Sequence, residues 1–383
     1  MAEALISALS TWPRDGIPHN PEAWLLTAAR RHLIDRSRHE RVKAQAALTL
    51  KAIGEQSYTA TATELVPDER LKLLFVCAHP AIDPEMHTPL MLQTVLGLEA
   101  REIARAFLVS PAAMSQRLVR AKTKIRHSGI QWEVPEKADL PPRLDAVMNA
   151  IYIAYGSGWE DAAGADARAR GLADEAIWLA RVLREQAPDE PEVRGLLALM
   201  LHCEARRSAR RSAQGEFIPL SAQDCRLWNA EMISEAEREL AAAVPAARPG
   251  RFQIEAAIQS VYAERAHSGR IDWHAVAVFY TQLVQLAPML GALIGRAAAV
   301  AEVSGPQAGL ALLDEIAPGA VQTYQPYWAV RAHLLQKLAH RLEAAHAFDQ
   351  AIGLAEDDAV RRFLLARRER TPATPGAESQ RKT

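Results

Sequence analysis

The chain has 383 residues, which at about 150 residues per domain suggests two or three domains. Hydrophobic residues make up 49% and charged residues 24%, a balance that excludes a disordered chain, and the cysteines (Cys77, Cys203 and Cys225) form no CxxC pair, which excludes a disulfide framework. No apolar run approaches the ~18 residues that span a bilayer and no signal-peptide pattern is visible, so we expect a cytoplasmic protein without a membrane segment.

The net charge is −1, but the cations are unevenly distributed along the chain. Residues 20–43 carry a net charge of +3 and residues 98–129 a net charge of +5, so the remainder carries −9. Two basic blocks in the first third of the chain predict that a polyanion binds there.

Amphipathic helical patterns dominate and no alternating strand pattern is convincing, which predicts an all-α fold. In chain order we expect a basic helical segment (1–43), a linker (44–66), a helical cluster (67–130), a proline-interrupted linker (131–142), a long helical region (143–370) and a disordered tail (371–383).

The first helix is predicted over residues 21–42, because Asn20 can cap it and Pro21 suits the first helical position. Trp24 either packs in a core or stacks on an unpaired base, and the pattern alone favours neither. The helix predicts nucleic-acid contact through a set of arginines: Arg30, Arg31, Arg36, Arg38 and Arg41.

Residues 98–129 predict two short helices joined by a turn. Ile103, Ala104 and Phe107 would face inward from the first helix, and Ser110 would cap the second. The apolar positions of the second helix recur at helical spacing: Met114, Leu118, Ala121 and Ile125. Its polar and basic positions are Ser115, Gln116, Arg117, Arg120, Lys122 and Lys124.

This pattern is typical of a helix-turn-helix whose second helix enters the major groove of DNA. Arg117 would contact a guanine edge, while Arg120 and Lys124 would contact phosphates. The alternative is a basic helix that only faces solvent.

The long helical region contains three similar breaks, at Pro188, Pro288 and Glu356, each following an amphipathic helix. The second and third breaks are 68 residues apart, twice the 34-residue period of tetratricopeptide repeats. We therefore expect a repeat-like region that binds a partner, with an ordinary helical bundle as the alternative.

Sites for chemistry are scarce in the sequence. Cys77-Ala78-His79-Pro80 contains two types of metal ligand without a second pair, which indicates a buried cysteine at a helix end. The chain lacks the GxSxG, HExxH, GxxxxGK[ST] and GxGxxG patterns. We expect no metal, no cofactor and no enzymatic activity.

The order of these motifs resembles sigma-70 family factors of the extracytoplasmic-function type. Residues 20–30 with Ile34-Asp35-Arg36 resemble the end of region 2, and residues 74–80, 102–109 and 117–122 resemble region 4. Residues 191–200, 205–210 and 309–314 resemble the tetratricopeptide-like extension that one subgroup carries.

The resemblance implies a sigma factor. Region 4 would recognise the minus-thirty-five element and bind the β flap of RNA polymerase core, and region 2 would recognise the minus-ten element and contact the β′ clamp. Promoter DNA and the polymerase core would be partners, with a further protein partner for the helical extension. We also expect region 4 to stay folded when residues 143–383 are removed.

The sequence departs from the family at several positions. Arg31 and Ser37 stand where asparagine and an apolar residue are usual, and Tyr155-Gly156-Ser157-Gly158-Trp159 replaces an aromatic-Asn-Glu-Gly-aromatic run. The first helices of region 2 have no counterpart before Pro13, which predicts weak binding of the polymerase core unless an upstream segment is added. Two alternatives remain open: a helical interaction protein whose sigma portion is inactive, and a DNA-binding regulator that acts without polymerase.

Overall fold

The computed structural model describes residues 68–127, 135, 139–160 and 167–370. Within these residues the chain forms helices and no β-strand, which confirms the predicted all-α fold; Arg211 and Phe217 form an isolated antiparallel bridge. The predicted helix over 21–42, the linker over 44–66 and the tail over 371–383 lie outside the described residues.

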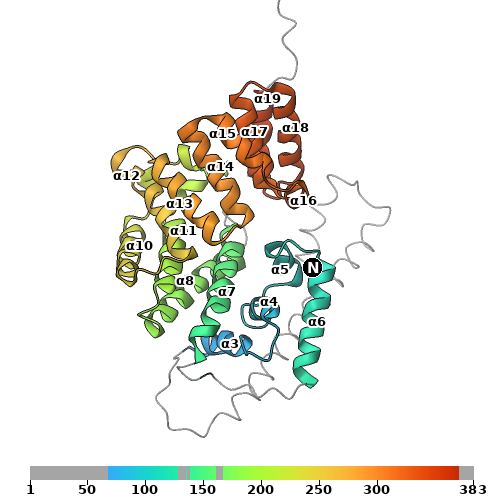
Figure 1. Ribbon diagram of the computed structural model, residues 1–383, viewed down its shortest axis with the longest axis vertical. Helices are drawn as coiled ribbons and strands as arrows, with labels where there is room; N and C mark the ends of the chain where they lie inside the picture. Colours follow the sequence, from blue (N-terminus) through green and yellow to red (C-terminus); the bar gives the residue numbers. More distant parts are fainter. Residues whose placement is uncertain (1–67, 128–134, 136–138, 161–166, 371–383) are drawn as a thin grey trace, which may run out of the picture.

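The first described part is a group of four helices in the lower half of Figure 1. Carboxylates fix the starts of two of them, because Asp68 accepts a hydrogen bond from Leu71 N and Asp83 accepts one from Glu85 N. At a third start Glu99 and Glu102 form a reciprocal capping box. The helices are α3 (Glu69–Cys77), α4 (Pro84–Thr94), α5 (Ala100–Ala106) and α6 (Pro111–His127).

The second part is an array of helices that extends from α7, beside the four-helix group, to α19 at the top of Figure 1. Short turns separate α8 from α9, α13 from α14 and α18 from α19, so each predicted break falls between two helices. The longer helices of the array are α7 (Pro141–Glu160), α8 (Ala167–Gln186), α9 (Pro191–Glu204), α10 (Ala230–Ala243), α11 (Arg251–Ala263), α13 (Trp273–Leu286), α14 (Leu290–Ser304), α15 (Pro306–Asp314), α17 (Gln325–Lys337), α18 (Arg341–Gly353) and α19 (Asp358–Glu369).

The two parts share one hydrophobic core, because α7 packs against both (Figure 1). Leu71, Phe75 and Leu90 from the four-helix group belong to the same buried cluster as Val147 and Ile151 from α7. This continuity argues against the expectation that the group folds when residues 143–383 are removed.

Polar contacts cross the same junction. Arg143, which is only 9% exposed, donates from Nη1 to the carbonyl of Phe75 at 3.1 Å. Thr88 donates to the carbonyl of Ala146 at 3.3 Å, and Arg70 pairs with Glu175 on α8. The buried contact of Arg143 and the two partly exposed contacts together fix the orientation of α7 on the four-helix group.

Two smaller cores complete the array, one centred on α11, α13 and α14 and one on α14 to α19. At the crossing of α14 and α15 a Cβ on Gly309 would stand 2.6 Å from the carbonyl oxygen of Ala297, so only glycine allows this close approach. The far end of the array returns to the first part, where Arg105 on α5 pairs with Glu356 at 2.9 Å.

No helix among the described residues is both long enough and apolar enough to cross a membrane.

Candidate nucleic-acid interface

The site begins with the turn between α5 and α6. Ile103 and Ala104 are buried, as predicted, and anchor α5 in the core. Leu108 adopts a left-handed conformation with φ 52°, which reverses the chain in four residues. Ser110 then accepts a hydrogen bond from Ala113 N at 3.2 Å, which confirms its predicted role as the cap of α6. The two helices are therefore held at a fixed mutual orientation.

Helix α6 has a buried face and an exposed face. Met114 and Leu118 are each 1% exposed, and Ala121 and Ile125 are half-buried on the same side. This confirms the predicted apolar stripe. The exposed face carries most of the predicted binding residues: Ser115, Gln116, Arg117, Arg120 and Lys124.

Lys122 is placed apart from the other predicted binding residues. It is half-buried, and this burial lowers the pKa of its ammonium group, while the thiol of Cys77 acts in the opposite direction. Cys77 is buried at the end of α3 and lies 3.6 Å from the hydroxyl of Thr94; burial raises its pKa to about 11. Lys122 thus belongs to the contact between α6 and the rest of the group.

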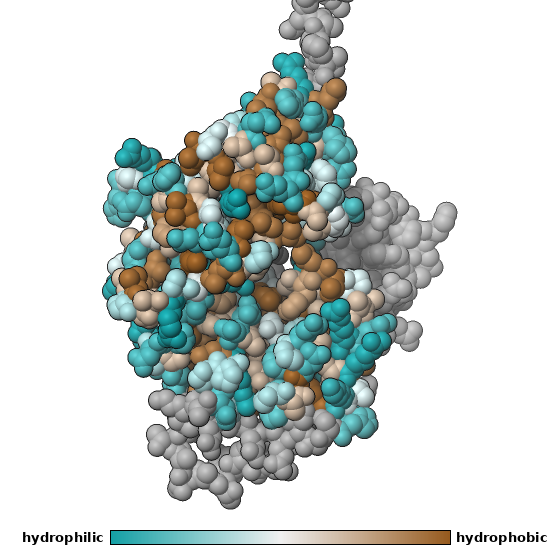
Figure 2. Space-filling view, in the orientation of Figure 1, coloured by the Kyte–Doolittle hydropathy of each residue, from teal (hydrophilic) through white to brown (hydrophobic). Residues whose placement is uncertain are grey.

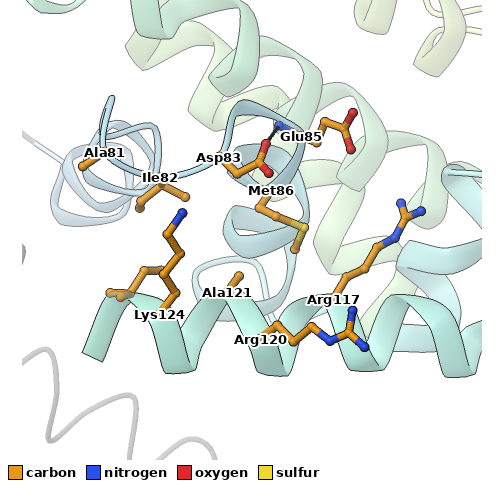
Figure 3. A pocket seen from close by; sticks show the side chains of 10 residues that line it. Ala81, Ile82, Asp83, Glu85, Met86, Arg117, Arg120, Ala121 and Lys124 are labelled. Carbon is orange, nitrogen blue, oxygen red and sulfur yellow. Dashed lines mark hydrogen bonds between the residues drawn. The ribbon is translucent and has the colours of Figure 1, made fainter. Parts of the chain in front are cut away.

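Beside α6 lies a hollow of about 320 Å³ that the sequence analysis missed. Arg117, Arg120 and Lys124 line it from α6, and Asp83 and Glu85 line it from the start of α4 (Figure 3). The side chain of Lys124 points to Ile82 in the turn before α4, that of Arg117 rises from α6 on the side where Glu85 lies, and that of Arg120 lies along α6 (Figure 3). Asp83-Pro84 is a helix-start pattern, so the sequence did hold a signal for this wall of the hollow.

The cations on the exposed face of α6 are not neutralised by neighbouring carboxylates of the described chain. Within the part of the chain that the structure describes, Arg117, Arg120, Lys124 and Arg126 form no ion pair. Hydrophilic side chains predominate on this part of the surface (Figure 2), although Val119 of α6 is also exposed. An exposed helix face with several uncompensated cations attracts a polyanion such as the nucleic-acid backbone.

The cations of α5 differ from those of α6. Arg101 pairs with Glu99 at 3.0 Å, and Arg105 pairs with Glu356 at 2.9 Å. The positive charge of residues 98–129 is therefore concentrated on α6, which the charge count alone does not reveal.

Other candidate residues have structural roles or lie elsewhere. His79 accepts a hydrogen bond from Ala81 N at 3.1 Å and so closes the turn before α4. Among the described residues no three potential metal ligands of the His, Cys, Asp and Glu types come together. The predicted region 2 residues lie outside the described residues: Trp24, Arg30, Arg31, Arg36, Arg38 and Arg41.

Over the described residues, fold and site together define an all-helical architecture in which a four-helix group with a basic exposed helix shares its core with a helical array. The chain is 38% identical, over 387 residues, to "Uncharacterized protein R00370" of Rhizobium meliloti (strain 1021); the alignment covers 99% of this chain and 91% of the relative. The chain therefore belongs to the same family as that protein. Residues 143–244 match a family of unknown function, DUF6596, and no solved structure matches the chain.

Proposed function

We propose that the protein is a sigma factor that directs RNA polymerase core to a set of promoters. The observation that carries the proposal is the exposed face of α6, which presents cations without ion-pair partners among the described residues, together with polar side chains. The opposite face of the same helix is a buried apolar stripe, and Ser110 caps the turn before it. An α-helix fits the major groove of DNA, which is about 12 Å wide. The resemblance of residues 74–80, 102–109 and 117–122 to sigma region 4 supports the same use of α6.

The hollow beside α6 supports different roles for two of its arginines. Arg117 lines the hollow on the side where Glu85 lies, and the carboxylates of Glu85 and Asp83 in the same hollow would repel a phosphate. This favours contact of Arg117 with a neutral guanine edge. Arg120 lies along α6 and is better placed for a phosphate.

Under this proposal the four-helix group acts as region 4. It binds the minus-thirty-five element and the β flap, while residues 1–43 act on the minus-ten element and the β′ clamp. The array then serves as the tetratricopeptide-like extension that contacts a further protein or the polymerase.

The DNA-binding step can be tested with the full chain and duplexes that it selects from a random library. We expect Arg117→Ala to relax base preference at one position by about 1–3 kcal/mol, because a bidentate base contact is lost. Arg120→Ala should weaken selected and scrambled duplexes alike and reduce the salt dependence by about one phosphate contact. Fluorescence anisotropy at several salt concentrations measures both effects.

Arg101→Ala is the matched control, since Arg101 is exposed and already paired with Glu99. It should leave both properties unchanged. Equal losses on selected and scrambled duplexes for Arg117→Ala and Arg120→Ala would contradict the assigned roles.

Transcription separates the sigma factor from its two rivals. A sigma factor added to purified polymerase core should start transcripts at promoters that contain the selected sequence. A regulator acting without polymerase would bind the duplex but start no transcript, and an interaction protein would bind neither duplex nor core.

A further inference from the structure

A second polar cavity lies in the array, far from α6 in the sequence, between α11 and the segment that joins α9 to α10. The joining segment is well fixed. Asn229 N donates to the carbonyl of Ala205 at 2.9 Å, and Ile218 N donates to the carbonyl of Arg210 at 2.9 Å. Arg265 donates to the carbonyls of Leu220 and Gln223 at 2.7 and 3.1 Å. The cavity wall is therefore a defined structure.

The cavity has a volume of about 270 Å³ and two kinds of lining. Its polar lining consists of Arg206, Arg210, Gln223 and Gln259. Its apolar lining includes Phe217 and Ile218, and the ring of Tyr262 completes it. Small-molecule sites combine an apolar surface with a few convergent polar groups in this way.

Arg206 is a buried cation without a carboxylate partner among the described residues. It is 7% exposed, and its guanidinium donates to two neutral acceptors, the carbonyl of His202 at 3.2 Å and the amide oxygen of Gln259. Burial of a charge is costly unless an opposite charge compensates it, so this group favours an anion in the cavity.

The nearby carboxylates are already engaged with other arginines. Glu204 holds Arg207 at 2.5 Å, Glu255 holds Arg251 at 2.7 Å, and Asp357 holds Arg211. The Nε and Nη1 atoms of Arg211 are buried without a hydrogen-bond partner in the described chain. These described carboxylates therefore hold arginines other than Arg206.

Arg210 adds to this positive potential. Burial and the adjacent charge of Arg211 lower the pKa of Arg210 to about 10, so it remains charged at neutral pH. An anion between Arg206 and Arg210 would be bound by two guanidinium groups, and the charge-assisted hydrogen bonds that such groups form are strong.

Gln223 adds a hydrogen-bond acceptor to a cavity whose other polar groups include two guanidinium donors. It is 6% exposed, and its amide nitrogen donates to the carbonyl of Ile218 at 3.3 Å, which leaves its amide oxygen buried without a partner in the described chain. A buried acceptor of this kind calls for a hydroxyl or another donor on the ligand.

We propose that this cavity binds a small organic oxyanion, a phosphate ester or a carboxylate. Its anionic end lies between Arg206 and Arg210, a donor group on it reaches Gln223, and its apolar part contacts Phe217, Ile218 and Tyr262. The proposal concerns the array alone and does not depend on DNA or polymerase binding.

Isothermal titration of the full chain at low ionic strength tests the proposal with inorganic phosphate, phenyl phosphate and benzoate as probes. We expect saturable binding of at least one organic anion at one site per chain. A stronger response to phenyl phosphate indicates a phosphate ester, and a stronger response to benzoate indicates a carboxylate. Benzyl alcohol, a neutral probe of similar size, should not bind, and chloride at matched ionic strength should not compete at the site.

The decisive variant is Gln259→Glu, which keeps the side-chain shape and places a carboxylate against the guanidinium of Arg206. We expect it to lower anion affinity at least tenfold while the thermal midpoint without anion stays equal or rises. If Gln259 had only a structural role, a loss of anion affinity in this variant would be accompanied by a lower thermal midpoint. Arg210→Gln should also lower affinity at least tenfold.

Arg181→Gln is the control, because Arg181 pairs with Glu235 at 2.8 Å outside the cavity. It should bind the anion as the unmodified chain does. The proposal is overturned if none of the three anions binds saturably, if benzyl alcohol binds as well as benzoate, or if Gln259→Glu and Arg210→Gln retain full affinity.

Discussion

At the scale of single residues, His202 shows how burial controls charge in the array. Its side chain is 1% exposed, and both ring nitrogens lack a hydrogen-bond partner among the described residues. Burial, reinforced by the nearby charge of Arg206, lowers the pKa of His202 to about 3, although Glu237 stands 3.4 Å from Nε2. Desolvation therefore outweighs the attraction of the partly exposed carboxylate, and the imidazole is neutral in the folded protein.

This shift predicts a loss of stability in mild acid. Between pH 6.5 and about 3 the unfolded chain binds a proton at His202 that the folded chain excludes, so the free energy of unfolding falls as the pH falls. From pH 7 to pH 5 this one group should cost about 2 kcal/mol. Urea unfolding at both pH values measures the change.

The variant His202→Leu isolates this contribution from that of other groups, including His333, whose pKa burial lowers to about 4. The difference in stability between pH 7 and pH 5 should shrink by about 2 kcal/mol in the variant. His267→Leu is the control, because the side chain of His267 is 77% exposed. If the variant His202→Leu kept the same pH dependence, the ring of His202 would be protonated at pH 5 in the folded protein as it is in the unfolded chain.

Residues also mark where sequence reasoning succeeded. The stripe of Met114 and Leu118 was predictable because helical spacing alone places them on one face. The same spacing places Lys122 one turn after Leu118, so its half-buried position was available from the pattern and was missed. The pairing of Arg105 with Glu356 was not predictable, because nothing local links residues so distant in the chain.

At the scale of elements, the turn between α5 and α6 holds backbone strain. Leu108 has φ 52°, a left-handed conformation that is unfavourable for a residue with a Cβ. Because its side chain is 61% exposed, packing offsets little of this unfavourable energy. The helix boundaries on either side follow from local chemistry, since the capping box of Glu99 and the cap by Ser110 are both written in the sequence.

We therefore predict that Leu108→Gly stabilises the protein. Relief of the left-handed strain should exceed the added entropy of the unfolded chain, for a net gain of about 0.5–1 kcal/mol. Leu365→Gly is the control, because Leu365 is 40% exposed within α19 and the same change there should cost about 1 kcal/mol. Chemical unfolding measures both, and a loss of stability in Leu108→Gly would show that its side chain contributes more than its backbone costs.

At the scale of the whole molecule, the four-helix group and the array are joined by one hydrophobic core through α7. The sequence predicted the helices and the breaks between them, because amphipathic spacing and proline positions are local. It could not predict that Phe75 and Val147 share a core, since any two apolar faces are compatible until the tertiary structure selects a pair. The site therefore depends on helices that a sequence-based division assigned to another domain.

This shared core predicts that a fragment ending at residue 140 is unstable. Loss of α7 exposes the apolar faces of α3 and α4 and removes the bond from Arg143 to Phe75. Circular dichroism during heating should show no cooperative transition for the fragment and a cooperative one for the full chain. Hydrogen exchange in α3 and α4 should be at least tenfold faster in the fragment, and equal protection in both would mean that the group folds independently.

The three cysteines differ in their environments, which predicts selective labelling of one of them. Thiol reagents attack the thiolate, and burial raises the pKa of both the buried Cys77 and the half-buried Cys203, which keeps these two sulfurs protonated. Cys225 is half-buried and lies two residues after Gln223 in the cavity wall. We therefore expect a maleimide dye to react first at Cys225, and a fluorophore there would report on the filling of the oxyanion cavity without any engineered cysteine.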